Sequence, residues 1–352
     1  MLPPSLSNLN SFGDVAAEDD AVLDYFLKTE AVSRIQKNDV CLVLGRKGAG
    51  KTALVRYFAE GAGAGTARSI SLRGYPWNVH ASRIDRGASD IEAYVSSWRY
   101  LICLEAALLA YGKAQPDLPR AKALKQFLDV NYGGVTPTLA DILKPPKLRV
   151  KGTSFEPEVL GFKIGSIDFE RKTDDLGLGA ELKALSDLLL ATAIELAESA
   201  GLPCLALHFD ELDQGLATLD DHRARMLTGL ILAAREVRQA TAKSKIIVNS
   251  VIYLRSDLWD DLKFSDKNKI SETVTLHLEW TPQTLLELVN ERLRFKLASE
   301  ASWESVTTDS LMRGSQTKWN HILARTFLRP RDVIKFLNAA LEQEANGAAV
   351  TS

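Results

Sequence analysis

Short hydrophobic runs alternate along the chain with segments whose apolar residues recur at helical spacing. Segments at residues 40–44, 67–72, 202–209, 246–254 and 273–278, the last with alternating polar and apolar residues, predict five strands. Continuous apolar runs such as residues 40–44 are typical of strands buried on both faces of a parallel sheet. Helical spacing predicts helices at residues 20–36, 53–60, 90–110, 122–130, 182–199 and 223–241. This alternation predicts an α/β fold, a five-stranded parallel sheet with helices on both faces.

The chain after the last predicted strand has a helical pattern only, at residues 285–297, 319–326 and 332–344. Between residues 144 and 171, glycine, proline and β-branched residues alternate with charged ones, which predicts a β-hairpin insertion. We therefore expect four parts. They are an N-terminal tail with short helices (1–36), a sheet domain (37–280, with an insertion at about 112–175), a helical lid subdomain (281–344) and a flexible tail (345–352).

Composition narrows the class of protein. Hydrophobic residues make up 46% of the 352 residues, enough for a sizeable core, and the formal net charge of −2 gives no reason to expect an overall basic nucleic-acid binder. Cys41, Cys103 and Cys204 lie far apart in apolar stretches, which favours buried thiols over disulfides or a zinc site. We find neither a signal peptide nor an apolar run of membrane-spanning length, and we expect a cytoplasmic location.

A glycine-rich motif follows the first predicted strand and precedes a predicted helix. It matches G-x-x-x-x-G-K-[ST], a loop that binds nucleotide phosphates in this structural context. Glycines let backbone N–H groups surround the phosphates, Lys51 would place a charge at the β- and γ-phosphates, and the Thr52 hydroxyl would complete a magnesium shell. The candidate nucleotide-binding residues are Gly45, Arg46, Lys47, Gly48, Ala49, Gly50, Lys51, Thr52 and Ala53. The alternative is a glycine-rich turn that binds nothing.

Two acidic residues end the third predicted strand. Asp210 would hold magnesium, directly or through water, and Glu211 would activate the attacking water. The alternative is a solvated acidic turn, to which Asp213 would also belong. His208, within the strand, is interpreted as a hydrogen-bonded core residue or a group that senses nucleotide. We find no guanine-specifying Asn-Lys-x-Asp motif, so the expected cofactors are ATP and Mg²⁺.

Arginines near two predicted element ends are further candidates. Arg255 ends the fourth strand, where ligands of parallel sheets bind, and would contact the γ-phosphate. The alternative is a surface arginine beside a helix that Ser256 or Asp257 caps. Arg331, with Arg329 as the alternate, would reach the phosphate from the last helix, unless both belong to a basic surface patch.

The order of these motifs resembles the ASCE division of P-loop NTPases, near the AAA+ and STAND ATPases and including relatives of origin-recognition ATPases. Three strings, at residues 23–26, 44–54 and 329–337, resemble a family of bacterial P-loop ATPases of unassigned cellular role. The resemblance spans about residues 10–342. It implies a five-stranded sheet, a helical lid and sensor roles for Arg255 and Arg331. Arg255 stands where the usual first sensor is Asn or Thr, and the β-hairpin is additional to a minimal core.

These features predict a magnesium-dependent ATPase that works as a regulatory switch through homo-oligomerisation or a separate effector protein, for example in bacterial antiviral defence or a stress response. A DNA-associated loader or remodeller is the alternative, suggested by the basic segments 144–151 and 325–331. A small-molecule kinase is a third class. Arg292 and Arg294 are interpreted as trans arginine fingers or as a solvated helix face, and no membrane partner is expected.

Overall fold

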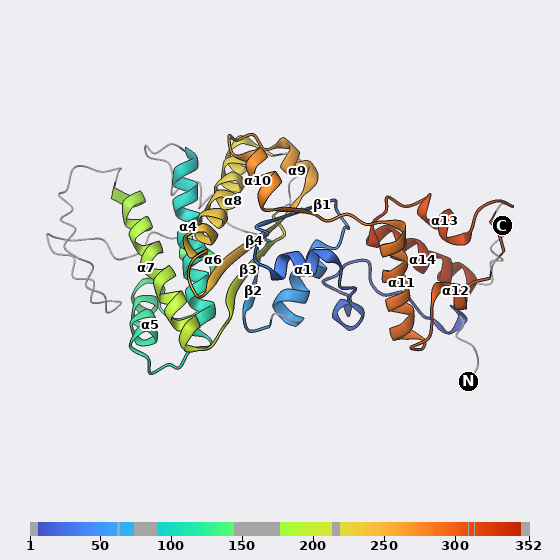
Figure 1. Cartoon of the computed structure of the whole chain (residues 1–352), viewed down its shortest axis with the longest axis horizontal. Helices are drawn as coiled ribbons and strands as arrows, with labels where there is room; N and C mark the ends of the chain where they lie inside the picture. The colour runs from blue at the N-terminus through green and yellow to red at the C-terminus, as the bar shows by residue number, and fades with distance from the viewer. Residues whose placement is uncertain are drawn as a thin grey trace. The chain divides into compact units, whose positions relative to one another are not determined.

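The structure, a computed structural model, describes residues 6–61, 64–73, 90–143, 177–212, 219–308, 310–312 and 314–345. It has a five-stranded, all-parallel sheet with the strand order β2-β3-β4-β1-β5 (Figure 1). The strands are β1 (Leu42–Gly45), β2 (Ala67–Ser71), β3 (Cys204–Asp210), β4 (Ile247–Arg255) and β5 (Thr275–His277). The α/β class and the five-stranded parallel sheet are therefore confirmed, whereas the expected β-hairpin lies outside the described residues.

The chain forms two compact units, and β1 passes from one to the other at residue 43. One unit contains β2, β3 and β4 with α4 (Asp90–Tyr111), α5 (Pro119–Tyr132), α6 (Leu139–Leu143), α7 (Gly177–Ser199), α8 (Asp221–Thr241), α9 (Ser256–Asp261) and α10 (Lys267–Thr273). Helix α4 packs against α7, α8 and β3. Its buried side chains lie on every side of the helix, from Trp98 and Tyr100 to Cys103 and Ala107, as expected for a central helix.

The other unit contains the start of the chain, the segment after β1 and the C-terminal helices. Its elements are η1 (Leu6–Asn8), η2 (Val22–Tyr25), α1 (Glu30–Gln36), α2 (Lys51–Arg56), η3 (Tyr57–Gly61), α11 (Pro282–Lys296), α12 (Trp303–Val306), α13 (Lys318–Leu323) and α14 (Pro330–Ala345). Leu9 and Phe12 share a hydrophobic core with Val289, Trp303 and Val333. Because each fully buried side chain contributes about 1.5–3 kcal/mol, this core anchors the N-terminal segment to the C-terminal helices.

Two sequence-based expectations need correction. The last strand is Thr275–His277, shorter than expected, because helix α10 occupies residues 267–273, a polar segment in which Ile270 is the buried residue. Cys41 and Cys103 are buried free thiols, but Cys204 is partly exposed because it is the first residue of β3. Burial raises the pKa of Cys41 to about 11 and that of Cys103 to about 12, so both thiols stay protonated and inert. None of the described helices has the length and apolarity to cross a membrane.

Candidate functional site

The glycine-rich loop, residues 45–52, connects β1 to α2. Gly48 and Gly50 have φ angles of 82° and 95°, the left-handed region that glycine adopts without strain. Lys51 begins α2, and its Nζ donates to the carbonyl oxygens of Gly45 at 3.0 Å and Arg46 at 3.3 Å. The lysine amino group therefore lies over the loop itself. The side chains of the remaining candidates range from exposed (Arg46 and Lys47) through half-buried (Thr52 and Ala53) to buried (Ala49).

The start of α14 lies against this loop. The backbone N–H of Arg331 donates to the carbonyl oxygen of Gly48 at 3.4 Å, and Nη1 of Arg329 donates to that of Lys47 at 3.1 Å. A Cβ on Gly48 would lie 2.8 Å from Cβ of Arg331, closer than real Cβ contacts. The structure thus brings Arg329 and Arg331 to the loop, where both are half-buried.

The acidic pair lies at the carboxyl end of β3. Asp210 is buried, and it pairs in register with Ser71, the last residue of β2. Glu211 has a φ of 61°, uncommon for a residue with a side chain, and its carboxylate accepts a hydrogen bond from Oγ of Ser71. The solvated-turn alternative is wrong for Asp210, while Asp213 lies outside the described residues.

His208 is the core residue that the sequence suggested. Its Nδ1 lies 2.9 Å from the hydroxyl of Tyr253 on β4, and burial lowers the pKa of His208 to about 3, so the ring stays neutral. Burial, and then the charge of Asp210, raise the pKa of Tyr253. Asn249, another polar residue of β4, donates to the carbonyl oxygen of Val40 at 3.0 Å inside the core, which is a structural role.

Arg255 ends β4 as expected, and its Nε donates to Oδ1 of Asp257 at 3.0 Å. This hydrogen bond lowers the pKa of the Asp257 carboxyl. Helix α9 begins at Ser256, directly after the strand, and its N-cap residue is Arg255, whose side chain makes no capping bond. The alternative in which Ser256 or Asp257 is the cap residue is therefore wrong, because strand and helix follow each other without a connecting loop.

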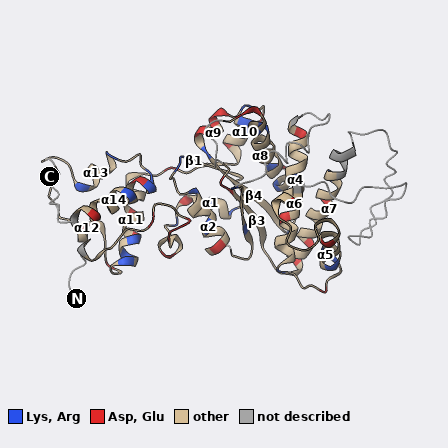
Figure 2. Cartoon of the chain, turned by 180° about the vertical axis from the view of Figure 1, so that it is seen from behind, with Lys and Arg blue, Asp and Glu red and all other residues tan. Residues whose placement is uncertain are grey.

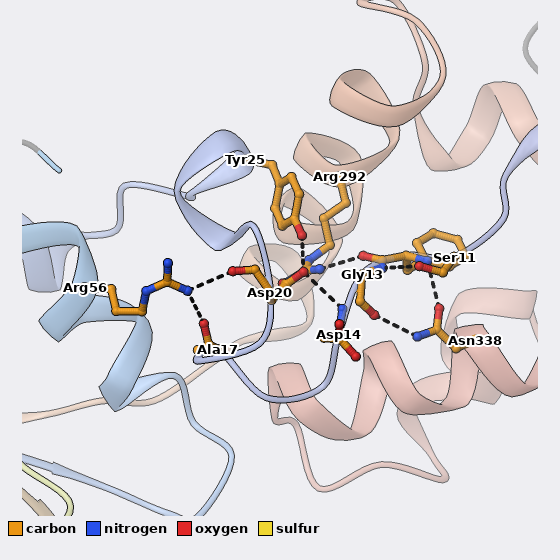
Figure 3. Close-up of polar contacts among 10 residues, drawn as sticks. Ser11, Gly13, Asp14, Ala17, Asp20, Tyr25, Arg56, Arg292 and Asn338 are labelled. Atoms are coloured by element: carbon orange, nitrogen blue, oxygen red, sulfur yellow. Dashed lines mark hydrogen bonds and ion pairs between the residues drawn. The ribbon is translucent and has the colours of Figure 1, made fainter. Parts of the chain in front are cut away.

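Both interpretations of Arg292, as a trans arginine finger and as part of a solvated helix face, are wrong. It lies on α11 four residues after Leu288, on the core-facing side, and is 4% exposed. Its Nη2 forms an ion pair with Oδ2 of Asp20 at 3.0 Å, and its Nη1 donates to the carbonyl oxygen of Phe12 at 2.6 Å (Figure 3). A buried, paired guanidinium has no access to a neighbouring subunit. Arg294, which pairs with Glu291 at 2.7 Å, does lie on the exposed face.

Two residues at these sites escaped the sequence analysis. Ser71 ends a strand of a parallel sheet, so the rule that identified Asp210 also applies to it. Trp280, whose Nε1 donates to the carbonyl oxygen of Ala49 at 2.8 Å, follows β5 and carries no motif. Across the described part of the chain, no group of three or more His, Cys, Asp or Glu side chains forms a ready metal site. A divalent cation here would need ligands from a bound phosphate as well.

Comparison with protein families matches residues 283–352 to the family described as a FunZ-associated C-terminal helical domain. This segment runs from α11 to α14 and so includes Arg329 and Arg331. No curated protein and no solved structure matches the chain.

Proposed function

We propose that this chain is a P-loop ATPase that binds ATP with magnesium at residues 45–52 and hydrolyses it. The observation that carries the proposal is the backbone of the loop. Left-handed Gly48 and Gly50 separate a buried parallel strand from a helix that begins with Lys51. Glycines in this conformation let backbone N–H groups of the loop approach an anion closely, and the start of a helix follows, an arrangement that suits a polyphosphate.

The proposed roles follow from the chemistry of each side chain. Lys51, which now bonds to loop carbonyls, would exchange these for phosphate oxygens. Thr52 and Asp210 would hold magnesium, which bridges phosphate oxygens and neutralises their charge. Glu211 would orient the attacking water once Ser71 releases its carboxylate.

The work of the ATPase is proposed to be regulatory. Arg331 and Arg329 connect the loop to the C-terminal helices by hydrogen bonds, so a bound nucleotide would change the contacts that the loop makes with these helices. Arg255 would respond to the γ-phosphate by exchanging its bond to Asp257. We expect this change to alter the binding of a second copy of the chain or of a separate effector protein.

The test is steady-state ATP hydrolysis with magnesium, together with equilibrium binding of the non-hydrolysable analogue AMP-PNP. Lys51→Ala should weaken binding at least tenfold, because a charge-assisted contact to phosphate is lost. Glu211→Gln should keep binding but lose turnover. Lys122→Ala, which removes an exposed lysine paired with Asp117, is the matched control and should resemble wild type. Wild-type protein that binds neither ATP nor AMP-PNP would overturn the proposal.

The described structure offers no observation in favour of the DNA-associated alternative. The basic segment 144–151 lies outside the described residues, and within 325–331 the side chains of Arg325 and Arg329 donate to carbonyl oxygens of the chain itself. Both basic and acidic residues occur on the helices of each unit (Figure 2). Repeating the hydrolysis assay with double-stranded DNA at two salt concentrations tests this alternative directly, because phosphate contacts weaken with salt.

A further inference from the structure

Three consecutive carbonyl groups of the glycine-rich loop accept hydrogen bonds from residues that follow β5. The carbonyl oxygen of Lys47 accepts from Nη1 of Arg329 at 3.1 Å, that of Gly48 from the N–H of Arg331 at 3.4 Å, and that of Ala49 from Nε1 of Trp280 at 2.8 Å. The Trp280 ring also lies beside Gly50, 3.9 Å from the position of a Cβ there. The loop is therefore held from the side on which its carbonyls point.

The geometry of the peptide bond turns this contact into an orientation of the N–H groups. In a planar trans peptide the C=O of one residue and the N–H of the next point in opposite directions, and no cis peptide bond is present among the described residues. The indole of Trp280 thus fixes the direction of the Gly50 N–H, and the guanidinium of Arg329 fixes that of Gly48. The N–H of Ala49 is held within the loop by the carbonyl oxygen of Arg46 at 3.1 Å.

External donors matter here because glycine does not hold its own conformation. Gly48 and Gly50 supply the left-handed angles, but each also has the largest conformational freedom to lose. Arg329 is itself immobilised, since its Nε donates to Asp332 at 2.6 Å and its guanidinium lies 4.9 Å from the ring centroid of Phe327. A rigid donor on each glycine-bearing peptide lowers the ordering cost that phosphate binding would otherwise carry.

We propose that Trp280 is a positioning residue of the nucleotide site, and that Arg329 acts with it, by holding loop carbonyls so that the N–H groups of Gly50 and Gly48 point at the phosphates. This inference rests on the proposed function. The ligand group that it concerns is the polyphosphate and not the base.

The experiment uses two probes, AMP-PNP with magnesium and inorganic tripolyphosphate, and compares Trp280→Phe with Trp319→Phe. The first variant keeps a ring beside Gly50 but removes the N–H, whereas the second makes the same change in the helical core away from the loop. We expect Trp280→Phe to raise the Kd of both probes by the same factor, about three- to tenfold, which corresponds to one neutral hydrogen bond. The melting temperature without ligand should match that of the control.

Arg329→Met provides a second, independent variant, with Arg325→Met as its control, because Arg325 donates to the carbonyl oxygen of His321 instead of the loop. It should also weaken both probes equally, and the double variant with Trp280→Phe should lose less than the product of the two factors, since both act on one loop. This variant also serves if Trp280→Phe does not fold.

The outcomes separate the two proposals. Wild-type protein that binds neither probe and hydrolyses no ATP removes the proposed function itself. Wild-type protein that binds both probes, with variants of unchanged affinity, leaves the ATPase standing and overturns the positioning role. Loss of AMP-PNP binding alone, with tripolyphosphate unaffected, would show that the Trp280 ring contacts the base, and this too overturns the inference.

Discussion

Replacing Arg292 by Met should be one of the most destabilising single changes in the unit that carries the glycine-rich loop. Arg292 and Asp20 have side chains that are 5% and 4% exposed, and their ion pair joins α11 to the N-terminal segment. Oδ1 of Asp20 also accepts from the N–H of Asp14 at 3.0 Å and from the hydroxyl of Tyr25 (Figure 3). Burial and this bond to Asp20 raise the pKa of Tyr25, so its hydroxyl stays a donor.

The expected magnitude follows from the burial of both charges. Removing one partner of a buried pair leaves the other as an uncompensated charge, which costs about 3–5 kcal/mol. Arg292→Met replaces the aliphatic stem of arginine by an apolar side chain of similar length to that stem, so most of this loss is due to the missing guanidinium. The variant also removes the donor to the carbonyl oxygen of Phe12, at 2.6 Å, and thereby loosens the segment that enters the core.

Arg294→Met is the matched control, because it makes the same substitution on the same helix. Arg294 pairs with Glu291, but their side chains are 46% and 37% exposed, and such a pair contributes at most about 1 kcal/mol. Urea unfolding monitored by near-ultraviolet circular dichroism measures both variants. Hydrogen exchange with mass spectrometry should show faster exchange at residues 12–20 in Arg292→Met and no change there in Arg294→Met.

Equal losses for the two variants would refute the argument, since the burial of Arg292 would then have no energetic consequence. The double variant Asp20→Asn with Arg292→Met sharpens the test. If the two charges stabilise each other, this variant should lose at least about 1 kcal/mol less than the sum of the single losses. Strict additivity would show that the pair is a contact without coupling.

Three further predictions concern the loop and the end of β3. Gly48→Ala should weaken AMP-PNP binding, and it should lower the free energy of unfolding in urea by more than the control Gly133→Ala. Both variants carry about 1–2 kcal/mol of left-handed strain. Of the two, Gly48→Ala alone also introduces a clash, because the new Cβ would lie 2.8 Å from Cβ of Arg331. Ser71→Ala should raise steady-state ATP turnover about fivefold, because the Glu211 carboxylate loses the hydrogen bond that holds it in place and becomes available to the attacking water, and an unchanged or lower rate would contradict this role. The free energy of unfolding should fall by about 2 kcal/mol between pH 7 and pH 5 through His208 alone. The folded-state pKa of about 3 keeps the ring neutral in this range, whereas the ring in the unfolded chain binds a proton below about pH 6.5. Urea unfolding of His208→Gln at both pH values should lack this part of the pH dependence.

Much of the sheet could be predicted from the sequence because burial leaves a local mark on composition. Residues 40–44 are a continuous apolar run, residues 246–254 are apolar except for Asn249 and Ser250, and both segments contribute to central strands of the sheet. Helix α10 could not be found in this way, since its sequence is polar and one buried side chain, Ile270, gives no periodicity. Its presence is decided by packing, which overrides local preference.

In the candidate site too, features with a local sequence pattern could be predicted and contacts between distant residues could not. The loop at residues 45–52 was found because the chemistry of phosphate binding requires its residues to be consecutive. The contact between Trp280 and Ala49 joins residues 231 positions apart, and that between Arg292 and Asp20 spans 272 positions. No local pattern records such pairings, so a buried arginine on α11 has the same sequence appearance as an exposed one.

The segment formed by the loop and α2 is connected at its start and at its end, directly or through the N-terminal segment, to the C-terminal part of the chain. At the loop end the contacts come from Trp280 and Arg329. At the other end, Nη1 of Arg56 donates to the carbonyl oxygen of Asp20 at 2.8 Å, and Asp20 in turn pairs with Arg292 of α11 (Figure 3). A displacement of the loop would therefore reach α14 directly and α11 through the N-terminal segment.

Arg56→Met tests whether the second connection matters to nucleotide binding. Arg56 does not contact the loop carbonyls, yet its loss would free the end of α2, and we expect the Kd of AMP-PNP to rise about two- to tenfold. Glu60→Gln is the control, because it removes the partner of Arg56 at 3.0 Å within the helical segment but leaves the bond to Asp20. If both variants bind AMP-PNP like wild type, the contacts at the loop alone connect the nucleotide site to the C-terminal helices, because α2 then transmits nothing that the loop does not.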